Sequence, residues 1–359
     1  MFKNQDFILE NKEIVLSNFQ FKAQAPSNIA LVKYWGKLEN QIPANPSLSF
    51  TLNNCKTITS VIVKPKESKE KFSFDFYFEG KLKESFRPKI ESFFNKTIEY
   101  LPFLTQFHFE IHSENTFPHS SGIASSASAM AALSLCMMQI EKEGNPSISE
   151  DYYFAKASFL ARLGSGSACR SVKGNIVAWG ETACLPEASN LYGVEIKNFH
   201  PIYKTFQDTV LLVDKGEKQV SSTLGHDLMN NHPFANRRFE QAHENLEKLL
   251  NVLQTDDLEA FIKIVESEAL TLHSMMMTSM PYFILMKPNT LEIIQKIWNF
   301  RQKTNLPVCF TLDAGANVHL LYPEKIKQEV QIFITNELQQ HCQNNHFIHD
   351  LVGNGGRLL

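Results

Sequence analysis

The stretch Asn115-Thr-Phe-Pro-His-Ser-Ser-Gly-Ile-Ala-Ser-Ser-Ala127 joins an expected strand to an expected helix. The first amides of a helix have no partner within it and lie at the positive end of its dipole. Small residues there let a phosphate approach the backbone, and serine hydroxyls can add hydrogen bonds or a Mg²⁺ ligand. A Ser- and Ala-rich helix packed closely on a sheet explains the same residues equally well, and the stretch lacks the Gly-Lys-Ser/Thr of a Walker A loop.

Strand and helix patterns flank this stretch on both sides. In the first part of the chain, strands are expected at 14–21, 57–63, 71–78, 106–113 and 175–179. A helix is expected at 125–143, and a second begins with a capping box at Ser147–Glu150 and ends at Gly164. After residue 200, strands are expected at 209–213, 308–313 and 318–322, and helices at 236–253, 258–272, 290–304 and 325–341. We therefore expect an α+β fold with an N-terminal lobe over 1–200 and a C-terminal lobe over 201–359.

Composition excludes several classes of protein. The net charge of −3 gives no indication of a nucleic-acid or acidic-membrane partner. The six cysteines show no C-x-x-C spacing, so we expect reduced thiols in a cytoplasmic chain rather than a zinc site. The segment 120–140 is uncharged and long enough for a bilayer, but its serines favour a buried helix with a polar mouth, and we expect no membrane association.

Three further stretches carry groups suited to anions or proton transfer. Ala25–Lys37 combines two lysines with Tyr34 and Trp35, Gly164–Ser171 is a Gly/Ser turn that ends near Arg170, and Phe310–Asn317 places Asp313 at a strand end before a Gly turn. Cations and turn amides suit a phosphorylated substrate, and a carboxylate at a strand end is a candidate base. Taken singly, each also fits a simpler explanation, namely an edge strand with solvated lysines, a helix C-cap with a flexible loop, and an Asp that initiates a turn.

Together these stretches resemble the diphosphomevalonate decarboxylases, a family of the GHMP small-molecule kinase superfamily, and they occur in that family's order. The matching motifs are Asn28-Ile-Ala-x-x-Lys33-Tyr-Trp-Gly-Lys37, Gly122-Ile-Ala-Ser-Ser-Ala127, Gly164-Ser-Gly-Ser-Ala-Cys-Arg170-Ser171 and Asp313-Ala-Gly315. Weaker matches lie at 220–223, His273 and 352–355, so that the resemblance spans nearly the whole chain.

The resemblance implies the GHMP kinase fold, with a ribosomal-protein-S5-domain-2-like N-terminal lobe, a ferredoxin-like C-terminal lobe and the active site between them. It implies ATP and Mg²⁺ as cofactors, mevalonate 5-diphosphate as the small-molecule substrate, and a homodimer. The implied reaction phosphorylates the tertiary hydroxyl of the substrate. Loss of that phosphate together with CO₂ then gives isopentenyl diphosphate.

The resemblance also implies roles for single residues. Asp313 would be the base facing the tertiary hydroxyl, Lys33 would hold the reacting groups, and Arg170 would bind the carboxylate side of the substrate. The residues implied to bind the rest of the substrate are Tyr34, Lys37, Ser167, Arg87 and Ser222, although no clear motif surrounds Arg87. Those implied to bind ATP are Gly122, Ala124, Ser125, Ser126 and Ala127, with Ser126 also the metal ligand.

Two departures from the family pattern bear on these implications. Ala316 stands where the family usually has Pro, which removes some rigidity from the turn, and His119-Ser-Ser121 replaces a Thr-Ala-Ala run, which leaves nucleotide preference open. Three alternatives also stay open: a decarboxylase of mevalonate 5-phosphate, a GHMP kinase such as a mevalonate kinase that stops after phosphoryl transfer, and an inactive GHMP fold that senses a ligand. The joint presence of Lys33, Arg170 and Asp313 argues against a simple kinase.

Overall fold

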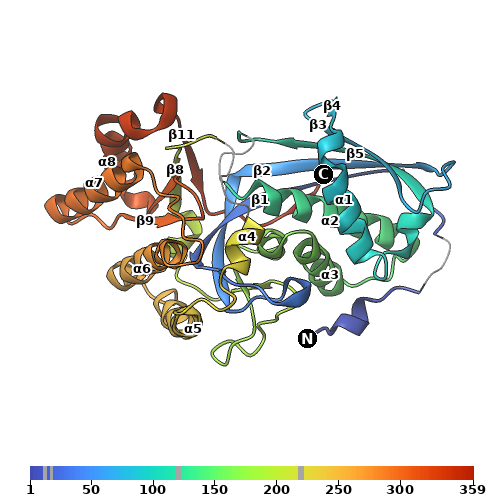
Figure 1. Ribbon diagram of the computed structural model, residues 1–359, viewed down its shortest axis with the longest axis horizontal. Coiled ribbons are helices and arrows are strands. Elements are labelled where there is room, and N and C mark those ends of the chain that lie inside the picture. The colour runs from blue at the N-terminus through green and yellow to red at the C-terminus, as the bar shows by residue number, and fades with distance from the viewer. Residues whose placement is uncertain (11–13, 17–18, 119–122, 217–221) are drawn as a thin grey trace.

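The computed structural model describes residues 1–10, 14–16, 19–118, 123–216 and 222–359. Figure 1 shows two halves side by side, one built mainly from the first part of the chain and the other from the last part. Each half consists of a sheet covered by helices. The expectation of an α+β protein is confirmed.

The sheet of the first half has the strand order β12-β1-β2-β5-β3-β4, with β6 paired to β2 and β7 paired to β6. Its strands are β1 (Gln20–Val32), β2 (Ser47–Pro65), β3 (Ser73–Phe78), β4 (Lys81–Leu82), β5 (Phe107–Asn115), β6 (Ile176–Trp179), β7 (Val194–Glu195) and β12 (Arg357–Leu358). The first six residues of β2 are all buried, whereas buried and partly exposed residues alternate along 55–63. Continuous burial means that both faces of the sheet are covered at that end.

Helices α1 (Arg87–Thr97), α2 (Ser125–Gly144) and α3 (Glu150–Gly164) pack on this sheet around one core. Helix α2 is the central one, and small residues let it lie close to β1 and β2. Its Ser128 shares a buried hydrogen bond of 2.6 Å with Thr57 on β2. Ser128 therefore serves the packing of α2 on the sheet, whereas Ser125 and Ser126 of the first turn line cavities.

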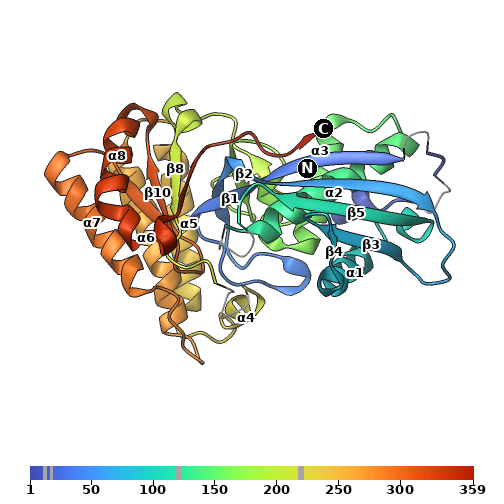
Figure 2. The ribbon, with the colours of Figure 1, turned by 90° about the horizontal axis from the view of Figure 1, so that it is seen from above.

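The second half has a four-stranded antiparallel sheet in the order β11-β8-β10-β9. Its strands are β8 (Gln207–Leu211), β9 (Cys309–Leu312), β10 (Val318–Tyr322) and β11 (Phe347–Leu351). Its helices are α4 (Ser222–Asp227), α5 (Ala235–Val252), α6 (Leu258–Met277), α7 (Pro288–Thr304) and α8 (Lys327–Phe333). Figure 2 shows α4 between the two halves, apart from the other helices.

The two halves share a hydrophobic core. Ile29 and Phe50 from the first sheet pack in one cluster with Val210 and Phe261 from the second half, which explains the full burial of that end of β2. The chain end then returns to the first half, where β12 pairs with β1. Near the end of β1, the carbonyl of Ala30 accepts from the hydroxyl of Thr311 on β9 at 3.3 Å, so these parts of the two sheets lie close to each other.

Most of the predicted elements are confirmed, and three predictions were wrong. The strand predicted at 14–21 begins later, at Gln20, and continues to Val32. The prediction missed its second part because residues 25–32 are buried and show no alternation of apolar and polar residues. Helix α3 is capped by Ser149, whose side chain accepts from the amide of Tyr152, so the capping box at Ser147 does not form. The helix predicted at 325–341 is divided into α8, a π turn at Ile334–Leu338 and short 3-10 turns. Among the described residues, no helix is long and apolar enough to cross a membrane.

Candidate active site

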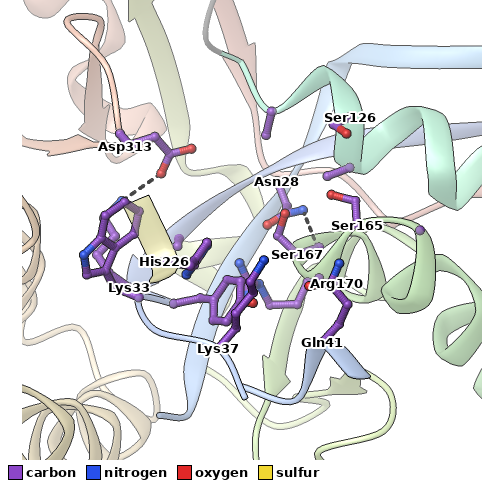
Figure 3. A pocket seen from close by; sticks show the side chains of 18 of the residues that line it. Asn28, Lys33, Lys37, Gln41, Ser126, Ser165, Ser167, Arg170, His226 and Asp313 are labelled. Atoms are coloured by element: carbon purple, nitrogen blue, oxygen red, sulfur yellow. Dashed lines mark hydrogen bonds and ion pairs between the residues drawn. The ribbon is translucent and has the colours of Figure 1, made fainter. Parts of the chain in front are cut away.

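A cleft lies between the two halves, at the ends of β1 and β9 and at the start of α2 (Figure 3). Its lining includes Asn28, Lys33, Tyr34, Lys37, Gln41, Lys89, Ala124, Ser126, Ala127, Ser165, Gly166, Ser167, Arg170, His226 and Asp313. Among these described residues there are four Lys or Arg side chains but a single carboxylate, that of Asp313. This excess of positive charge favours an anionic ligand.

Asp313 follows β9 directly, and its carboxylate meets the lysine at the end of β1 (Figure 3). The Oδ1 atom of Asp313 lies 3.1 Å from Nζ of Lys33. The Lys33 side chain is 2% exposed and that of Asp313 is 29% exposed, so the carboxylate remains accessible to a ligand. Burial lowers the pKa of Lys33, and the charge of Asp313 opposes this change.

The backbone of Asp313 is held by a buried histidine of α6. Nε2 of His273 donates to the carbonyl oxygen of Asp313 at 3.1 Å. Burial lowers the pKa of His273 to about 4, so the ring is neutral at pH 7 and donates through this one nitrogen. The weak sequence match at His273 therefore corresponds to a residue that holds the backbone carbonyl of Asp313 in place by a hydrogen bond.

Arg170 is a buried cation whose described partners are hydroxyl groups. Its Nε donates to Ser49 at 2.7 Å and its NH1 to Ser47 at 2.5 Å, and its guanidinium lies over the ring of Trp179. No carboxylate of the described residues lies within ion-pair distance of this 2% exposed side chain. Burial lowers its pKa, but an arginine stays protonated, and a buried charge without an anion calls for one from a ligand.

The Gly/Ser turn that contains Arg170 is held against β1. Asn28 donates through Nδ2 to the carbonyl of Ser167 at 3.1 Å and to the hydroxyl of Ser171 at 2.8 Å. A Cβ atom on Gly166 would lie 3.0 Å from the hydroxyl of Tyr34, closer than a side chain normally approaches. Glycine therefore lets the turn come close to Tyr34.

The Tyr34 hydroxyl is buried in the cleft lining and has no hydrogen-bond partner among the described residues. Burial raises the pKa of this phenol, which stays protonated and can donate to a ligand oxygen. Gly36, with φ of +98°, turns the chain so that Lys37 also reaches the cleft. There Nζ of Lys37 lies 3.7 Å from Oδ1 of Asp227 on α4.

The start of α2 forms another part of the lining. Its N-cap residue, Ala124, has a left-handed backbone with φ of +38° and provides no side-chain cap. A non-glycine residue in this region is strained, and such strain is often found at binding sites. The hydroxyl of Ser126 accepts from Nζ of Lys89 at 2.5 Å, so a cation lies beside the first turn of the helix. Amides, hydroxyl and ammonium together suit a phosphate.

A second, apolar cavity adjoins this helix start. Ser126 and Lys89 line both cavities. The apolar part of its lining comes from β3, β5, α1, α2 and the 3-10 turn Glu84–Phe86, and it includes Phe76, Phe78, Phe86, Ile90, Ile111, Met130 and Leu133. A ligand with phosphates at the start of α2 could place a flat apolar ring there.

The structure brings together most of the site residues implied by the sequence. Arg87 does not line the cleft: its guanidinium lies over Phe74, donates to the carbonyl of the same residue and pairs with Glu70. Ser125 lines the apolar cavity and not the cleft. Gly122 and residues 119–121 lie outside the described residues, and Ser222 begins α4 but its side chain is not described.

Three polar lining residues were missed by the sequence analysis. Lys89 belongs to an amphipathic helix in which a surface lysine is expected, and Gln41 lies in a short loop without a motif. His226 of α4 packs on the ring of Tyr34, and its Nδ1 accepts from the amide of Gly36 at 3.0 Å. Because each reaches the cleft only through tertiary packing, no local sequence signal marks them.

The turn after Asp313 contains Gly315, and Ala316 stands where the family usually has Pro. Gly315 is not left-handed, and a Cβ atom there would meet nothing within 4 Å, so the backbone does not require glycine. The carbonyl of Ala316 accepts from the Thr290 hydroxyl on α7 at 2.7 Å. This buried hydrogen bond ties the turn to α7 where a proline would have restricted the chain.

The described residues contain no group of three His, Cys, Asp or Glu side chains that could hold a metal ion. Mg²⁺ often keeps few protein ligands and takes the remainder from phosphates and water. The Ser126 hydroxyl at the start of α2 fits such a role. The residues therefore fit Mg²⁺ in combination with a phosphate ligand.

Comparisons with known proteins agree with this geometry. The family model of the diphosphomevalonate decarboxylase-like N-terminal domain matches residues 25–189, and that of the mevalonate 5-diphosphate decarboxylase C-terminal domain matches 209–354. A diphosphomevalonate decarboxylase of Ganoderma lucidum is 30% identical over 339 residues, 89% of this chain and 82% of the relative. The crystal structure of a mevalonate diphosphate decarboxylase from Legionella pneumophila is 31% identical, with a TM-score of 0.77 over 92% of this chain and 100% of that one. MDDEF, solved in complex with MVAPP, AMPPCP and magnesium, is 28% identical, with a TM-score of 0.81 over 95% and 99%.

Proposed function

This chain belongs to the diphosphomevalonate decarboxylase family, and we propose that its cleft carries out the reaction of that family. The protein has the GHMP kinase fold and catalyses ATP-dependent decarboxylation of mevalonate 5-diphosphate to isopentenyl diphosphate, with release of ADP, phosphate and CO₂. The observation that carries the assignment is the Lys33–Asp313 pair, set in a cleft whose other Lys and Arg side chains add positive charge that favours an anionic substrate.

Asp313 acts as the general base. A tertiary alcohol is a weak nucleophile, and a carboxylate that takes its proton assists its attack on the γ-phosphate of ATP. Lys33 keeps this carboxylate ionised and adds positive charge beside the reacting oxygens. The exposure of Asp313 toward the cleft supports this role, whereas Lys33 approaches from the buried side.

Arg170 binds the substrate carboxylate. In the second step the C–O bond to the tertiary phosphate breaks and the phosphate leaves with that electron pair. The C–C bond to the carboxylate breaks in turn, its electrons form the new double bond, and CO₂ departs. An arginine held by Ser47 and Ser49 can keep the carboxylate aligned for this elimination.

The diphosphate of the substrate binds at the other end of the cleft, to Tyr34, Lys37 and Ser167. The unpartnered hydroxyl of Tyr34 supports this placement, because a buried donor without an acceptor is costly. His226 and Gln41 lie in the same lining and complete the pocket. Arg87 does not line the cleft and pairs with Glu70, so we leave it out of the substrate site.

ATP phosphates bind at the start of α2, and the base enters the apolar cavity that shares Ser126 and Lys89 with the cleft. Ser126 would hold Mg²⁺, which would neutralise phosphate charge. The complex of MDDEF with MVAPP, AMPPCP and magnesium supports both ligands for this chain. Ala124, Ala127 and Ser125 would shape this site by their small size.

The organisation of the chain is part of the proposal. We place the lobe boundary near residue 200, because strands up to β7 belong to the first sheet and β8 opens the second. The six cysteines are free thiols, which supports a cytoplasmic location. The family resemblance supports a homodimer, and light scattering would measure it.

The test supplies ATP·Mg²⁺ with mevalonate 5-diphosphate, mevalonate 5-phosphate or mevalonate, and measures ADP and CO₂. We expect ADP and CO₂ in equal amounts, with the diphosphate the best substrate. ADP without CO₂ would identify a kinase, and faster turnover of the monophosphate would identify the other decarboxylase. No ADP with any substrate would indicate an inactive ligand-binding fold.

A further inference from the structure

The end of β1 is held by a buried ionic pair that comes from two helices of the second half. Glu268 of α6 is fully buried, and its Oε2 accepts from the amide of Lys33 at 2.8 Å. Arg238 of α5 donates to both carboxylate oxygens of Glu268, at 2.9 and 2.6 Å. The same guanidinium donates through NH2 to the carbonyl of Lys33 at 3.1 Å. The Glu268–Arg238 pair therefore contacts both polar groups of the Lys33 backbone.

Two amides complete this network. Asn245 donates to Oε1 of Glu268 at 2.7 Å, and Asn45 donates to the carbonyl of Lys33 at 2.9 Å. The pairing of β1 with β2 ends at Val32, so the ladder no longer satisfies the backbone of the next residue. Asn45 of the first half and the Glu268–Arg238 pair of the second half satisfy the backbone of this residue instead.

The charge of Glu268 also acts on the Lys33 ammonium. Burial lowers the pKa of Lys33, and after Asp313 the largest opposing charge is Glu268. The ionisable groups that face Lys33 are Asp313, Glu268, Arg170, Arg238, His273 and His319. Removal of one of the two carboxylates would leave the positive neighbours in excess.

We propose that the Glu268–Arg238 pair is a positioning device that holds the backbone N–H and C=O of Lys33 and thereby places its ammonium beside Asp313. Docking of α5 and α6 onto the first half thereby assembles the catalytic pair, because each half supplies one of its members. This role rests on the proposed function of Lys33 and Asp313, and it goes beyond it in assigning two residues that do not line the cleft.

The test compares Glu268→Gln with a matched substitution on the same helix, Glu266→Gln. Glu266 is buried and binds Arg301 and Trp298, so its loss also breaks a structural ion pair, but it makes no contact with Lys33. We expect kcat of Glu268→Gln to fall at least ~10-fold while KM for both substrates changes by less than about 3-fold. The alkaline limb of its pH–rate profile should move to lower pH by roughly half a unit or more, because Lys33 would lose its proton earlier. Glu266→Gln should keep the wild-type kcat and profile.

A purely structural role predicts that both variants lose stability and activity alike, with unchanged pH profiles, and this result would overturn the proposal. If Glu268→Gln does not fold, Arg238→Lys replaces it, because lysine keeps the charge but cannot span Glu268 and the Lys33 carbonyl. An unchanged kcat in Arg238→Lys would equally overturn it. The activity of the wild-type protein distinguishes failure of the proposed function from failure of this inference. An inactive wild type would contradict the proposed function, whereas an active wild type leaves only the role of the Glu268–Arg238 pair to be tested.

Discussion

Replacement of Asp313 by Asn is the most direct test of the catalytic assignment. Asn has nearly the same shape and can still accept from Lys33, whose Nζ lies 3.1 Å from the carboxylate in the native protein. It cannot accept the proton of the tertiary hydroxyl. Loss of a general base costs ~10²–10⁴ in rate, or roughly 3–5 kcal/mol of barrier.

The structure adds a second effect in the same direction. At 3.1 Å and an effective dielectric constant of about 20, the gross attraction between Lys33 and Asp313 is on the order of 5 kcal/mol. Without that charge, the buried Lys33 is deprotonated at lower pH. We therefore expect a loss nearer the upper end of the range for Asp313→Asn. Asp313→Glu keeps the charge and should lose less.

The assay follows ADP and CO₂ under saturating substrates, and calorimetry with a non-hydrolysable ATP analogue follows binding. We expect kcat of Asp313→Asn to fall at least ~100-fold, with both KM values within about 3-fold of wild type. Asp151→Asn, an exposed change in the first turn of α3, is the control and should behave as wild type. A fall in kcat of less than about 10-fold would refute the assignment and make Asp313 a turn residue.

Three further predictions concern other parts of the site. Ser126→Leu should abolish nucleotide turnover in a folded protein, because a larger side chain would occupy the space that a phosphate needs within ~3 Å of the first amides of α2. An unchanged affinity for ATP would show that this segment is an ordinary buried helix without a role in binding. Arg170→Met should lower kcat/KM for the substrate ~100-fold or more with little change in KM for ATP, and a loss below about 5-fold in steady-state kinetics would contradict carboxylate binding. Burial depresses the pKa of His273 from 6.5 to about 4, so its stabilising contribution is complete above about pH 6.5 and is lost as pH falls toward 4. Urea titrations should give a contribution of His273 to the free energy of unfolding that is on the order of 2 kcal/mol smaller at pH 5 than at pH 7. The His273→Gln variant should lack this part of the pH dependence, and an equal pH dependence in both proteins would contradict the prediction.

The local order of small, charged and apolar residues was enough to predict the helices and much of the site. The start of α2, the Gly/Ser turn around Ser167 and the strand end at Asp313 are each encoded by neighbours in the chain, and their joint order carried the family resemblance. The alternation of apolar and polar residues did not predict the strand along 25–32. This part of β1 is buried, and an alternating pattern marks a strand only where one face is exposed to solvent. The irregular helix after Lys327 was likewise predicted as continuous, because its apolar spacing does not distinguish α from π or 3-10 turns.

Only the tertiary structure shows which distant residues meet. Lys33 and Asp313 are 280 positions apart, and Glu268 reaches the amide of Lys33 from 235 positions away. Nothing near Glu268, Arg238 or His226 in the sequence marks them, because a buried charge on an amphipathic helix looks like any other polar residue until its partner is known. Arg87 illustrates the reverse case, since the family resemblance implied a substrate ligand there but its side chain contacts Phe74 and Glu70. The chemistry of single segments is a local property, whereas the burial and charge balance that tune Lys33 arise from the packing of the two halves against each other.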